Sequence, residues 1–516
     1  MNKKTPDNYI SGTTLQSEFY SNHAPTHLNF VAASNGFQPR PLNGPFTWCD
    51  YGCGNAITAN VLAGCYPDAK FYGVDYLPSR IRTAKSLSNS ARLENTVFIQ
   101  KRFSELAKSD IPPLDFAIIH GILSRADETE RNATLDDATK RLKPGGILLT
   151  GVNAMPGWAA RLPMRNMIYS LTKDSDNTLE RARVGLEWMH KLKTANVKYF
   201  RDNQALAETI EELEKADLRH MEHEYFNVNL RAFYFAEMQA LMESRGLKFA
   251  GCARIFLNMV DLAVPIDLRD EFRSVSSRAE LEAKRDFIRN ETFRSDIWVK
   301  GEPISTEKEW LDVNQKLVFG TLEPFLNIDK TVAFGDIQLS YENEPFSTLL
   351  NILADRGVNI GSMENEAMLA SMSPWTRMDA VRLLTAGSQV ICFAKETEPV
   401  KVPEGAKLSM PSINRGMIKE IGLSLPSITL AAPLAGTGIE VLNIDAIFLL
   451  ARCDKGTDGA IEETEKIISI SEGDVTMNGK ILKPKEVRVL LVKRSKIIED
   501  KMIGKLAEIG AVTIEI

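Results

Sequence analysis

Apolar runs alternate with helical patterns through residues 46 to 150 of the chain. The runs at 46–49 and 71–74 each lead into an acidic residue, and the segment between them, from Thr58 to Gly64, has the spacing of a helix. A second helical pattern covers 135–142, where Lys143-Pro-Gly-Gly146 ends it. The alternation includes three further apolar runs, at 96–99, 114–119 and 147–150. This order predicts an α/β fold in which helices join the strands of a parallel sheet.

The next part of the chain is mainly helical in pattern. Apolar residues repeat at helical spacing in 204–218, among glutamates that predict a solvated helix face, and 233–244 has a second helical pattern. The pattern therefore predicts a helical middle domain over 162–305. It follows a first domain over 1–161, which begins with an N-terminal arm.

A third region begins after residue 305. Helical patterns at 346–356 and 378–384 are followed by a short apolar run at 389–393. We therefore expect a winged-helix-like domain over 306–400. The polar segment 395–407, rich in Pro and Glu, is typical of a linker.

The last region, 401–516, is expected to be of α+β type. The apolar run at 486–492 predicts a strand, and 497–506 has the pattern of an amphipathic helix. A small basic cluster follows the run, and we expect it to be a solvated strand end: Lys493, Arg494 and Lys496.

The composition is that of an ordinary globular protein, with 44% hydrophobic and 25% charged residues among 516. The formal net charge of −6 argues against general nucleic-acid binding, which favours a basic surface. Six cysteines without a closely spaced group of partners predict buried thiols in a reducing compartment and no metal site. The N-terminus lacks the apolar core of a signal peptide, and the uncharged stretch 421–439 has the prolines and glycines of a buried irregular segment. We therefore expect a cytoplasmic protein without membrane insertion.

The first strand ends at Asp50 and leads into a tight glycine turn, Asp50-Tyr-Gly52-Cys53-Gly54. Glycines at such a turn let a ligand approach the backbone and leave amide groups free at a helix N-terminus. Asp75, 21 positions after Gly54, ends the next strand, where a carboxylate can accept hydrogen bonds from both ribose hydroxyls. This arrangement predicts a nucleotide-like cofactor, with a glycine turn of another α/β domain as the alternative.

Two residues distinguish the cofactor classes that use this arrangement. Ile57 stands where a dinucleotide fingerprint requires a third glycine. Asp50 would repel a diphosphate but can bind an ammonium group, which S-adenosylmethionine carries and NAD lacks. The residues therefore favour S-adenosylmethionine over NAD. The predicted cofactor-binding residues of this part are Asp50, Gly52, Cys53, Gly54, Asp75 and Tyr76.

Further candidates follow the other predicted strands. Phe103 could stack on an adenine and Ser104 could hydrogen-bond to it. His120 would stand at the tip of its strand, the edge beyond which ligands of open parallel sheets bind, and there it would contact the cofactor. A histidine in this place more often lines or orients than acts as a base. The candidate catalytic residues are Tyr20, His120, Asn153 and Trp158.

Several short segments between residues 5 and 300 form a specific combination: Tyr20–Pro25, Asp50–Gly54, Gly73–Asp75, Asp115–Gly121, Lys143–Gly146, Asn153–Trp158, His223–Phe226, Tyr234–Glu237, Arg289–Arg294 and Asp296–Val299. In this combination the chain resembles bacterial class I methyltransferases that carry a methyltransferase regulatory domain. That group includes the rickettsial outer-membrane-protein lysine methyltransferases. The chain departs from the pattern at Asn55-Ala56, where a glycine is common, and at Arg125, where an aromatic residue is frequent.

The resemblance implies a Rossmann-like methyltransferase domain, a helical domain and winged-helix-like material, with S-adenosyl-L-methionine as the methyl donor. It also implies an enzyme that methylates lysine side chains of a protein substrate. The alternatives are an enzyme acting on a small molecule, glycan or lipid precursor, and a non-catalytic cofactor-binding module. The bulk of the chain after residue 162 favours a macromolecular substrate. We expect the residues after Gly301 to select it, so that a chain ending there should still bind the donor.

Overall fold

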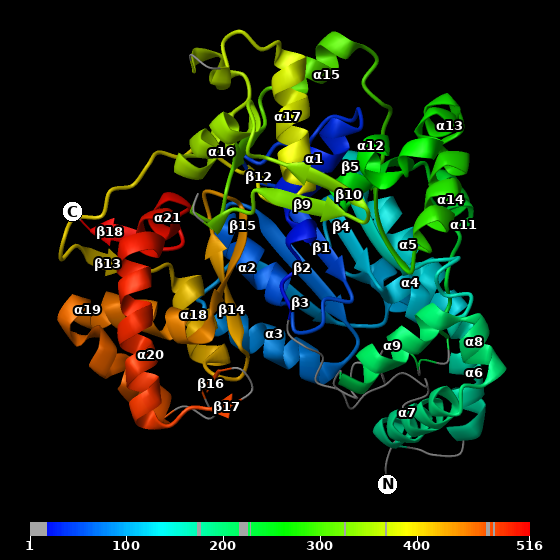
Figure 1. Cartoon of the computed structure of the whole chain (residues 1–516), viewed down its shortest axis with the longest axis horizontal. Helices are drawn as coiled ribbons and strands as arrows, with labels where there is room; N and C mark the ends of the chain where they lie inside the picture. The colour runs from blue at the N-terminus through cyan, green and yellow to red at the C-terminus, as the bar shows by residue number, and fades with distance from the viewer. Residues whose placement is uncertain are drawn as a thin grey trace.

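A seven-stranded sheet forms the centre of the computed structural model, in the order β3-β2-β1-β4-β5-β7-β6 (Figure 1). The structure describes residues 18–172, 177–215, 225, 227, 229–324, 327–366, 369–470, 475–477 and 480–515. The strands that the apolar runs predict are parallel: β1 (Thr47–Tyr51), β2 (Lys70–Asp75), β3 (Thr96–Gln100), β4 (Leu114–His120) and β5 (Leu142–Asn153). The strand order reverses between β1 and β4, which is where open α/β sheets bind ligands.

Two antiparallel strands extend the sheet beyond β5. β7 (Phe293–Val299) pairs with β5, and β6 (Lys248–Cys252) pairs with β7. Both strands therefore belong to the central sheet and not to the helical domain that the pattern predicts over 162–305. The α/β prediction is confirmed, with a sheet that is mixed instead of wholly parallel.

Arg294 of β7 is buried and paired with three acidic side chains. Its guanidinium donates to Asp296 at 2.8 Å, to Glu282 at 2.7 Å and to Asp286 at 2.5 Å. Glu282 and Asp286 come from α14 (Arg278–Arg289), so the ion pairs tie this helix to β7. A buried cation is tolerated only with such partners.

Helices cover both faces of the sheet. One face carries α1 (Pro25–Ser34), α2 (Ile57–Cys65) and α3 (Pro78–Ser90), and the other carries α4 (Ile122–Arg125), α5 (Glu128–Arg141) and α11 (Phe235–Glu243). The pleat of β1 sends Trp48 to the first face and Cys49 and Tyr51 to the second, because successive side chains of a strand alternate. Asp127 begins α5 by accepting a hydrogen bond from the Glu130 amide at 2.9 Å.

A group of helices follows β5 and has a core of its own. It consists of α6 (Arg161–Thr172), α7 (Thr178–Thr194), α8 (Lys198–Asp202) and α9 (Gln204–Lys215), gathered at the lower right of Figure 1. The helix predicted over 204–218 is confirmed as far as Lys215, and its last residues lie outside the described ones. Two short helices, α12 (Val260–Ala263) and α13 (Arg269–Ser274), lie between β6 and α14.

Residues 306–400 form a smaller unit. Its helices are α15 (Glu307–Asn314), α16 (Phe346–Asp355) and α17 (Pro374–Ala386), and its strands are β8 (Val318–Gly320), β9 (Thr331–Phe334), β10 (Ile337–Ser340), β11 (Val358–Asn359) and β12 (Ile391–Phe393). The strands form a sheet in the order β11-β8-β12 and a separate β9–β10 hairpin. The predicted helices at 346–356 and 378–384 and the strand at 389–393 are confirmed, while the winged-helix assignment stays a prediction.

The C-terminal region corrects two expectations. Its elements are β13 (Lys407–Ser409), α18 (Ser412–Ile421), β14 (Ser427–Ala432), β15 (Thr437–Leu442), α19 (Asn443–Ile470), β16 (Thr476–Met477), β17 (Lys480–Ile481), α20 (Pro484–Ile497), α21 (Ile503–Glu508) and β18 (Thr513–Glu515). The run at 486–492 is part of α20, not a strand. The stretch 421–439 is largely a buried β-hairpin, not an irregular segment. None of the helices among the described residues is both long and apolar enough to cross a bilayer.

Helix α20 forms because its local signals agree. Pro484 occupies the first turn, and the Glu486 carboxylate accepts a hydrogen bond from the Lys483 amide at 2.8 Å. Val487 and Leu491 lie four residues apart and are both buried, which is helical spacing. Arg494, expected at a solvated strand end, instead pairs with buried Asp445 of α19.

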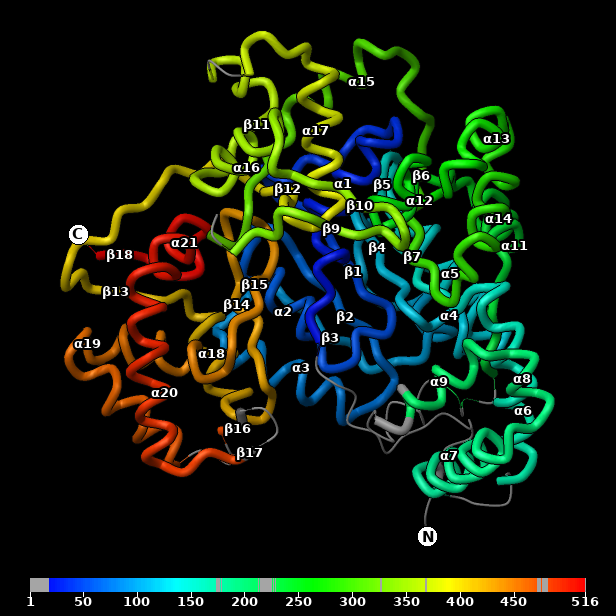
Figure 2. The backbone as a smooth tube through the Cα atoms, viewed as in Figure 1, coloured from blue at the N-terminus to red at the C-terminus, as the bar shows by residue number. Residues whose placement is uncertain are grey.

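The C-terminal region packs against α2 and α3 (Figure 2). The Tyr66 hydroxyl, just after α2, donates to the Gly436 carbonyl at 2.9 Å, and α18 approaches the end of α3 so closely that a Cβ on Gly416 would overlap the Ala91 backbone. Side chains of both parts form one hydrophobic core. The residues after Gly301 are therefore part of the structure that supports the first domain.

Candidate active site

The turn between β1 and α2 is formed by residues in the left-handed backbone region. Gly52, Gly54 and Ala56 have φ values of +93°, +56° and +56°. A Cβ on Gly52 would overlap the Ile122 side chain, whereas a Cβ on Gly54 would meet no described atom within 4 Å. Ala56 adopts a conformation that costs a residue with a side chain about 1–2 kcal/mol. The turn is thus held in a strained shape, and its Gly52 and Cys53 amides donate to the Val74 carbonyl at 2.7 and 3.1 Å.

Asp75 fastens this turn to the tip of β2. Its Oδ2 accepts a hydrogen bond from the Gly54 amide at 3.2 Å, and its Oδ1 accepts one from the Leu77 amide at 2.9 Å. Arg80 Nη1 lies 3.3 Å from Oδ2. A carboxylate has about four acceptor positions, so the donors among the described residues leave one position for a ligand. Asp75 can therefore accept one ribose hydroxyl, not both, without giving up an existing bond.

Asp50 is buried at the end of β1. Burial first, and the charge of Asp75 second, raise the pKa of its carboxyl from 3.8 to about 7. A nearby cation would lower this pKa again, because it favours the ionised form. Burial also raises the pKa of the Cys53 thiol, so this neighbour is an uncharged wall of the turn. The pair suits an ammonium group better than a phosphate.

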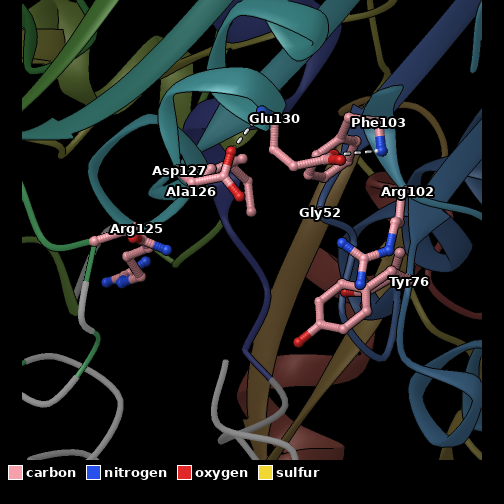
Figure 3. Close-up of a pocket in the computed structure, with 11 residues that line it drawn as sticks. Gly52, Tyr76, Arg102, Phe103, Arg125, Ala126, Asp127 and Glu130 are labelled. Atoms are coloured by element: carbon pink, nitrogen blue, oxygen red, sulfur yellow. Dashed lines mark hydrogen bonds between the residues drawn. The ribbon is translucent and has the colours of Figure 1, made fainter. Parts of the chain in front are cut away.

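A cavity of about 60 Å³ lies beyond the ends of β1 and β2 (Figure 3). Four predicted cofactor residues line it: Gly52, Asp75, Tyr76 and Phe103. Asp50, Cys53, Gly54, Ser104 and His120 lie outside its lining. The remaining lining residues are Arg102, Ile122, Arg125, Ala126, Asp127, Glu130 and Asn229.

Tyr20, His23 and His120 form an aromatic cluster beside the end of β4. The ring centroids are 4.9 Å apart for Tyr20 and His23, 4.8 Å for Tyr20 and His120, and 4.9 Å for the two histidines. Phe293 of β7 adds a fourth ring, 5.2 Å from His120. The Tyr20 amide donates to Thr58 Oγ1 at 3.0 Å, which holds the N-terminal arm on α2. The arm, β4 and β7 thus meet at one place.

His23 contributes an uncharged ring to this aromatic cluster. The side chain is buried, and neither ring nitrogen has a hydrogen-bond partner within the part of the chain that the structure describes. Burial, followed by the neighbouring His120 and His27, lowers its pKa well below 6.5. His23 is therefore neutral at pH 7 and is a weak base.

Asn153 and Trp158 take different places. Asn153, at the end of β5, is the register partner of Phe293. Its backbone N–H donates to Ser124 Oγ at 2.8 Å. Its buried Nδ2 has no hydrogen-bond partner among the described residues. Trp158 is buried in the core of the α6–α9 group, with its ring 5.4 Å from that of Tyr225. The fold thus brings Asn153 next to a ring of the aromatic cluster and gives Trp158 a packing position.

Sequence reasoning missed several residues of this site, among them His23, Phe293 and Glu130. His23 had a signal, because it lies three positions after Tyr20 within one of the segments that carry the resemblance. Phe293 reaches the site only through the pairing of β5 with β7, and Glu130 only through the packing of α5 against the 103–108 turn. No local sequence pattern predicts such contacts between distant segments.

Arg125, where the resemblance breaks, is buried at the end of α4 and lines the cavity. Its guanidinium lies over Gly121, where a Cβ would overlap Nη1. The glycine at the tip of β4 therefore makes room for this arginine. The substitution places a positive charge beside the cavity where an aromatic ring would be neutral.

The residues present fit S-adenosylmethionine. Asp50 offers a carboxylate for the ammonium group, Asp75 an acceptor for the ribose and Phe103 an apolar face for the base. The same two acids would repel a pyrophosphate. The cavity itself has room for a few water molecules. The described part of the chain contains no group of three metal-ligating His, Cys, Asp or Glu side chains.

Two protein families match parts of this chain. Residues 44–196 match a family described as a methyltransferase domain, and residues 217–300 match one described as a predicted methyltransferase regulatory domain. The first match contains the glycine turn, both acids and the cavity-lining residues up to Glu130. The second contains β6, β7 and α14.

Two relatives match most of this chain in sequence, and one solved structure matches it in fold. An uncharacterised protein of Synechocystis sp. is 26% identical over 456 residues, which are 88% of this chain and 89% of that protein. An uncharacterised protein of Rickettsia prowazekii is 24% identical over 68% of this chain and 62% of its own length. The structure of PKMT2 from Rickettsia typhi in complex with AdoHcy matches with a TM-score of 0.69 at 17% identity, covering 96% of this chain and 99% of that one. The fold is thus shared over nearly the whole chain.

Proposed function

We propose that this chain methylates lysine side chains of proteins. The premise is that it is an S-adenosylmethionine-dependent methyltransferase with a methyltransferase regulatory domain. The fold shared with PKMT2, a rickettsial lysine methyltransferase, supports this choice of acceptor. The observation that carries the proposal is the aromatic cluster of Tyr20, His23 and His120 at the end of β4, in which His23 is neutral.

The aromatic cluster suits an amine acceptor for an electrostatic reason. A lysine ammonium has an unperturbed pKa of about 10.4 and must lose its proton before it can attack a methyl group. An apolar aromatic surface disfavours the charged form and so lowers that pKa. His23 stays neutral and adds no charge that would oppose this effect.

The chain's own groups then align the two reactants. S-adenosylmethionine would supply a methyl group on a sulfonium, which the amine nitrogen attacks in line as S-adenosylhomocysteine leaves. Asp50 holds the ammonium of the donor, and Asp75 holds a ribose hydroxyl. Tyr20, His120 and Asn153 orient the acceptor amine, and the Asn153 carboxamide oxygen can accept a hydrogen bond from it. The proton leaves to solvent before transfer, since the lowered pKa of His23 makes it a poor acceptor.

We assign the division of labour along the chain as part of the same proposal. Residues 1–161 with β6 and β7 bind the donor, and the α6–α9 group together with residues 306–400 and 401–516 selects the protein substrate. The size of these added regions supports a macromolecular acceptor, because a small molecule does not require them.

The test is the fate of labelled methyl groups. The purified enzyme is incubated with methyl-labelled donor and lysate of its host, and the label is followed into protein and small-molecule fractions. We expect it in protein, released on acid hydrolysis as methyl-lysine. A variant with Asp50→Ala serves as the control. Label in a small molecule, or in no fraction at all, would contradict the proposal.

A further inference from the structure

A carboxylate bridges two elements at the side of the cavity that Phe103 lines. Glu130, in the first turn of α5, accepts hydrogen bonds from the Phe103 amide at 2.9 Å, from the Ser104 amide at 3.2 Å and from the Ser104 hydroxyl. Figure 3 shows its side chain reaching from the α5 side toward Phe103. Glu130 thus takes up the donors that Ser104 was expected to offer to an adenine.

Among the described residues, the donors to Glu130 leave one acceptor position of its carboxylate unused. Oε2 accepts from both amides and Oε1 accepts from the hydroxyl, whereas a carboxylate has about four acceptor positions. The three donors fix the orientation of the carboxylate, and the residue lines the cavity beside Phe103. Asp127 also lines the cavity, but its Oδ1 is engaged in capping α5.

We propose that Glu130 selects the nucleobase of the methyl donor, by accepting at Oε1 a hydrogen bond from an exocyclic amino group of a purine stacked on Phe103. Asp75, the expected acceptor for the ribose, lines the same cavity. This recognition of the base involves the methyl donor only and does not depend on the acceptor.

The chemistry separates amino from oxo purines. An amino group offers an N–H to the carboxylate, and a hydrogen bond to a charged group is among the stronger ones. An oxo group in the same place would present lone pairs to a negative charge, which is repulsive and leaves the carboxylate without its fourth bond. The site therefore accepts adenine and rejects hypoxanthine.

Calorimetry with two product analogues tests the assignment. S-adenosylhomocysteine and S-inosylhomocysteine differ in the 6-substituent of the base, amino or oxo, and in N1, which carries a proton only in the inosyl compound. We expect the unmodified protein to bind the adenosyl compound at least about tenfold more tightly, the effect of one charged hydrogen bond. Glu130→Gln, whose amide can donate to an oxo group while its oxygen still accepts from the backbone, should bring the two affinities within about threefold.

Glu128→Gln is the matched control, because Glu128 is an exposed carboxylate in the same turn of α5 and lies outside the cavity lining. It should keep the full discrimination. Equal binding of the two compounds by the unmodified protein would overturn the proposal, even if Glu130→Gln failed to fold. So would tighter binding of both compounds to Glu130→Gln, since the carboxylate would then obstruct the base. Either result leaves lysine methylation untouched, because no acceptor is present.

Discussion

Asp75 and Gly54 are joined by a hydrogen bond of 3.2 Å from the Gly54 amide to Asp75 Oδ2. The carboxylate expected to hold the ribose therefore also holds the glycine turn in place. Loss of Asp75 removes a ligand contact and loosens the backbone that forms the other side of the site.

Asp75→Ala should accordingly weaken the binding of S-adenosylhomocysteine by about tenfold to a hundredfold, since hydrogen bonds to a charged group contribute roughly 1.5–3 kcal/mol. Isothermal titration calorimetry measures the change. Asp68→Ala, which removes an exposed acid in the turn before β2, should leave the affinity unaltered. An unchanged affinity in Asp75→Ala would show that the donor binds elsewhere.

The pKa of Asp50, raised to about 7, makes donor binding depend on pH. Below pH 7 the carboxyl is protonated and loses its attraction for the donor's ammonium, so affinity should fall as the pH decreases, by up to about tenfold per unit. Asp50→Asn should bind weakly at every pH and show no such slope. The measurement is the dissociation constant of S-adenosylhomocysteine between pH 5.5 and 8.5.

The same carboxyl should affect the stability of the protein without ligand, in the opposite sense to its role in binding. Its pKa is higher in the folded than in the unfolded state, so the folded state binds more protons between pH 4 and 7 and loses stability as the pH rises through that range. Asp50→Asn should therefore raise Tm at pH 8 and have little effect at pH 4. A lower Tm at pH 8 would refute this sign.

Gly52 and Gly54 should respond differently to the same substitution. Gly52→Ala places a Cβ into Ile122 and demands a φ of +93°. We therefore expect the unfolding free energy to fall by more than about 2 kcal/mol, and we expect donor binding to become too weak to measure. Gly54→Ala meets open space at a φ of +56° and should cost only about 1 kcal/mol. Thermal denaturation of both variants gives the comparison, and equal losses would contradict it.

His23→Phe distinguishes a neutral surface from a proton acceptor. With the pKa of His23 well below 6.5 and the ring serving as part of an aromatic surface, kcat should stay within about threefold of the unmodified enzyme. If His23 took the proton in the rate-limiting step, kcat would fall by about a hundredfold or more. The assay is methyl transfer to the protein substrate under donor saturation, with donor affinity measured alongside.

Gly416→Ala tests the junction between the C-terminal region and the first domain. A Cβ would meet the Ala91 backbone, which cannot move aside cheaply, so the unfolding free energy should fall by about 1–3 kcal/mol. Gly44→Ala is the control, because a Cβ there would meet no described atom within 4 Å. A Tm equal to that of the control would show that the two regions are not packed as described.

The five parallel strands could be predicted because each is a short apolar run followed by turn residues. β7 could not, since Arg294 and Asp296 look like surface residues until α14 supplies partners for them. The strand expected at 486–492 shows the reverse error. Its β-branched residues favour a strand, but Pro484, Glu486 and the spacing of Val487 and Leu491 favour a helix, and the packing decides.

The site divides in the same way. Asp50, Gly52, Gly54 and Asp75 follow from one local turn, so sequence spacing is enough to place them together. Its position after β5 makes Trp158 a candidate catalytic residue, yet its ring packs in the core of the α6–α9 group. An aromatic residue near a strand end has no local sign of which side it will face, because that depends on helices formed later in the chain.

Helix α2 begins at the glycine turn and ends on the C-terminal hairpin, where Cys65 Sγ contacts the Thr437 carbonyl at 3.2 Å and Tyr66 holds Gly436. Its nine residues make a rod of about 13 Å. One short helix therefore separates the glycine turn from the C-terminal hairpin.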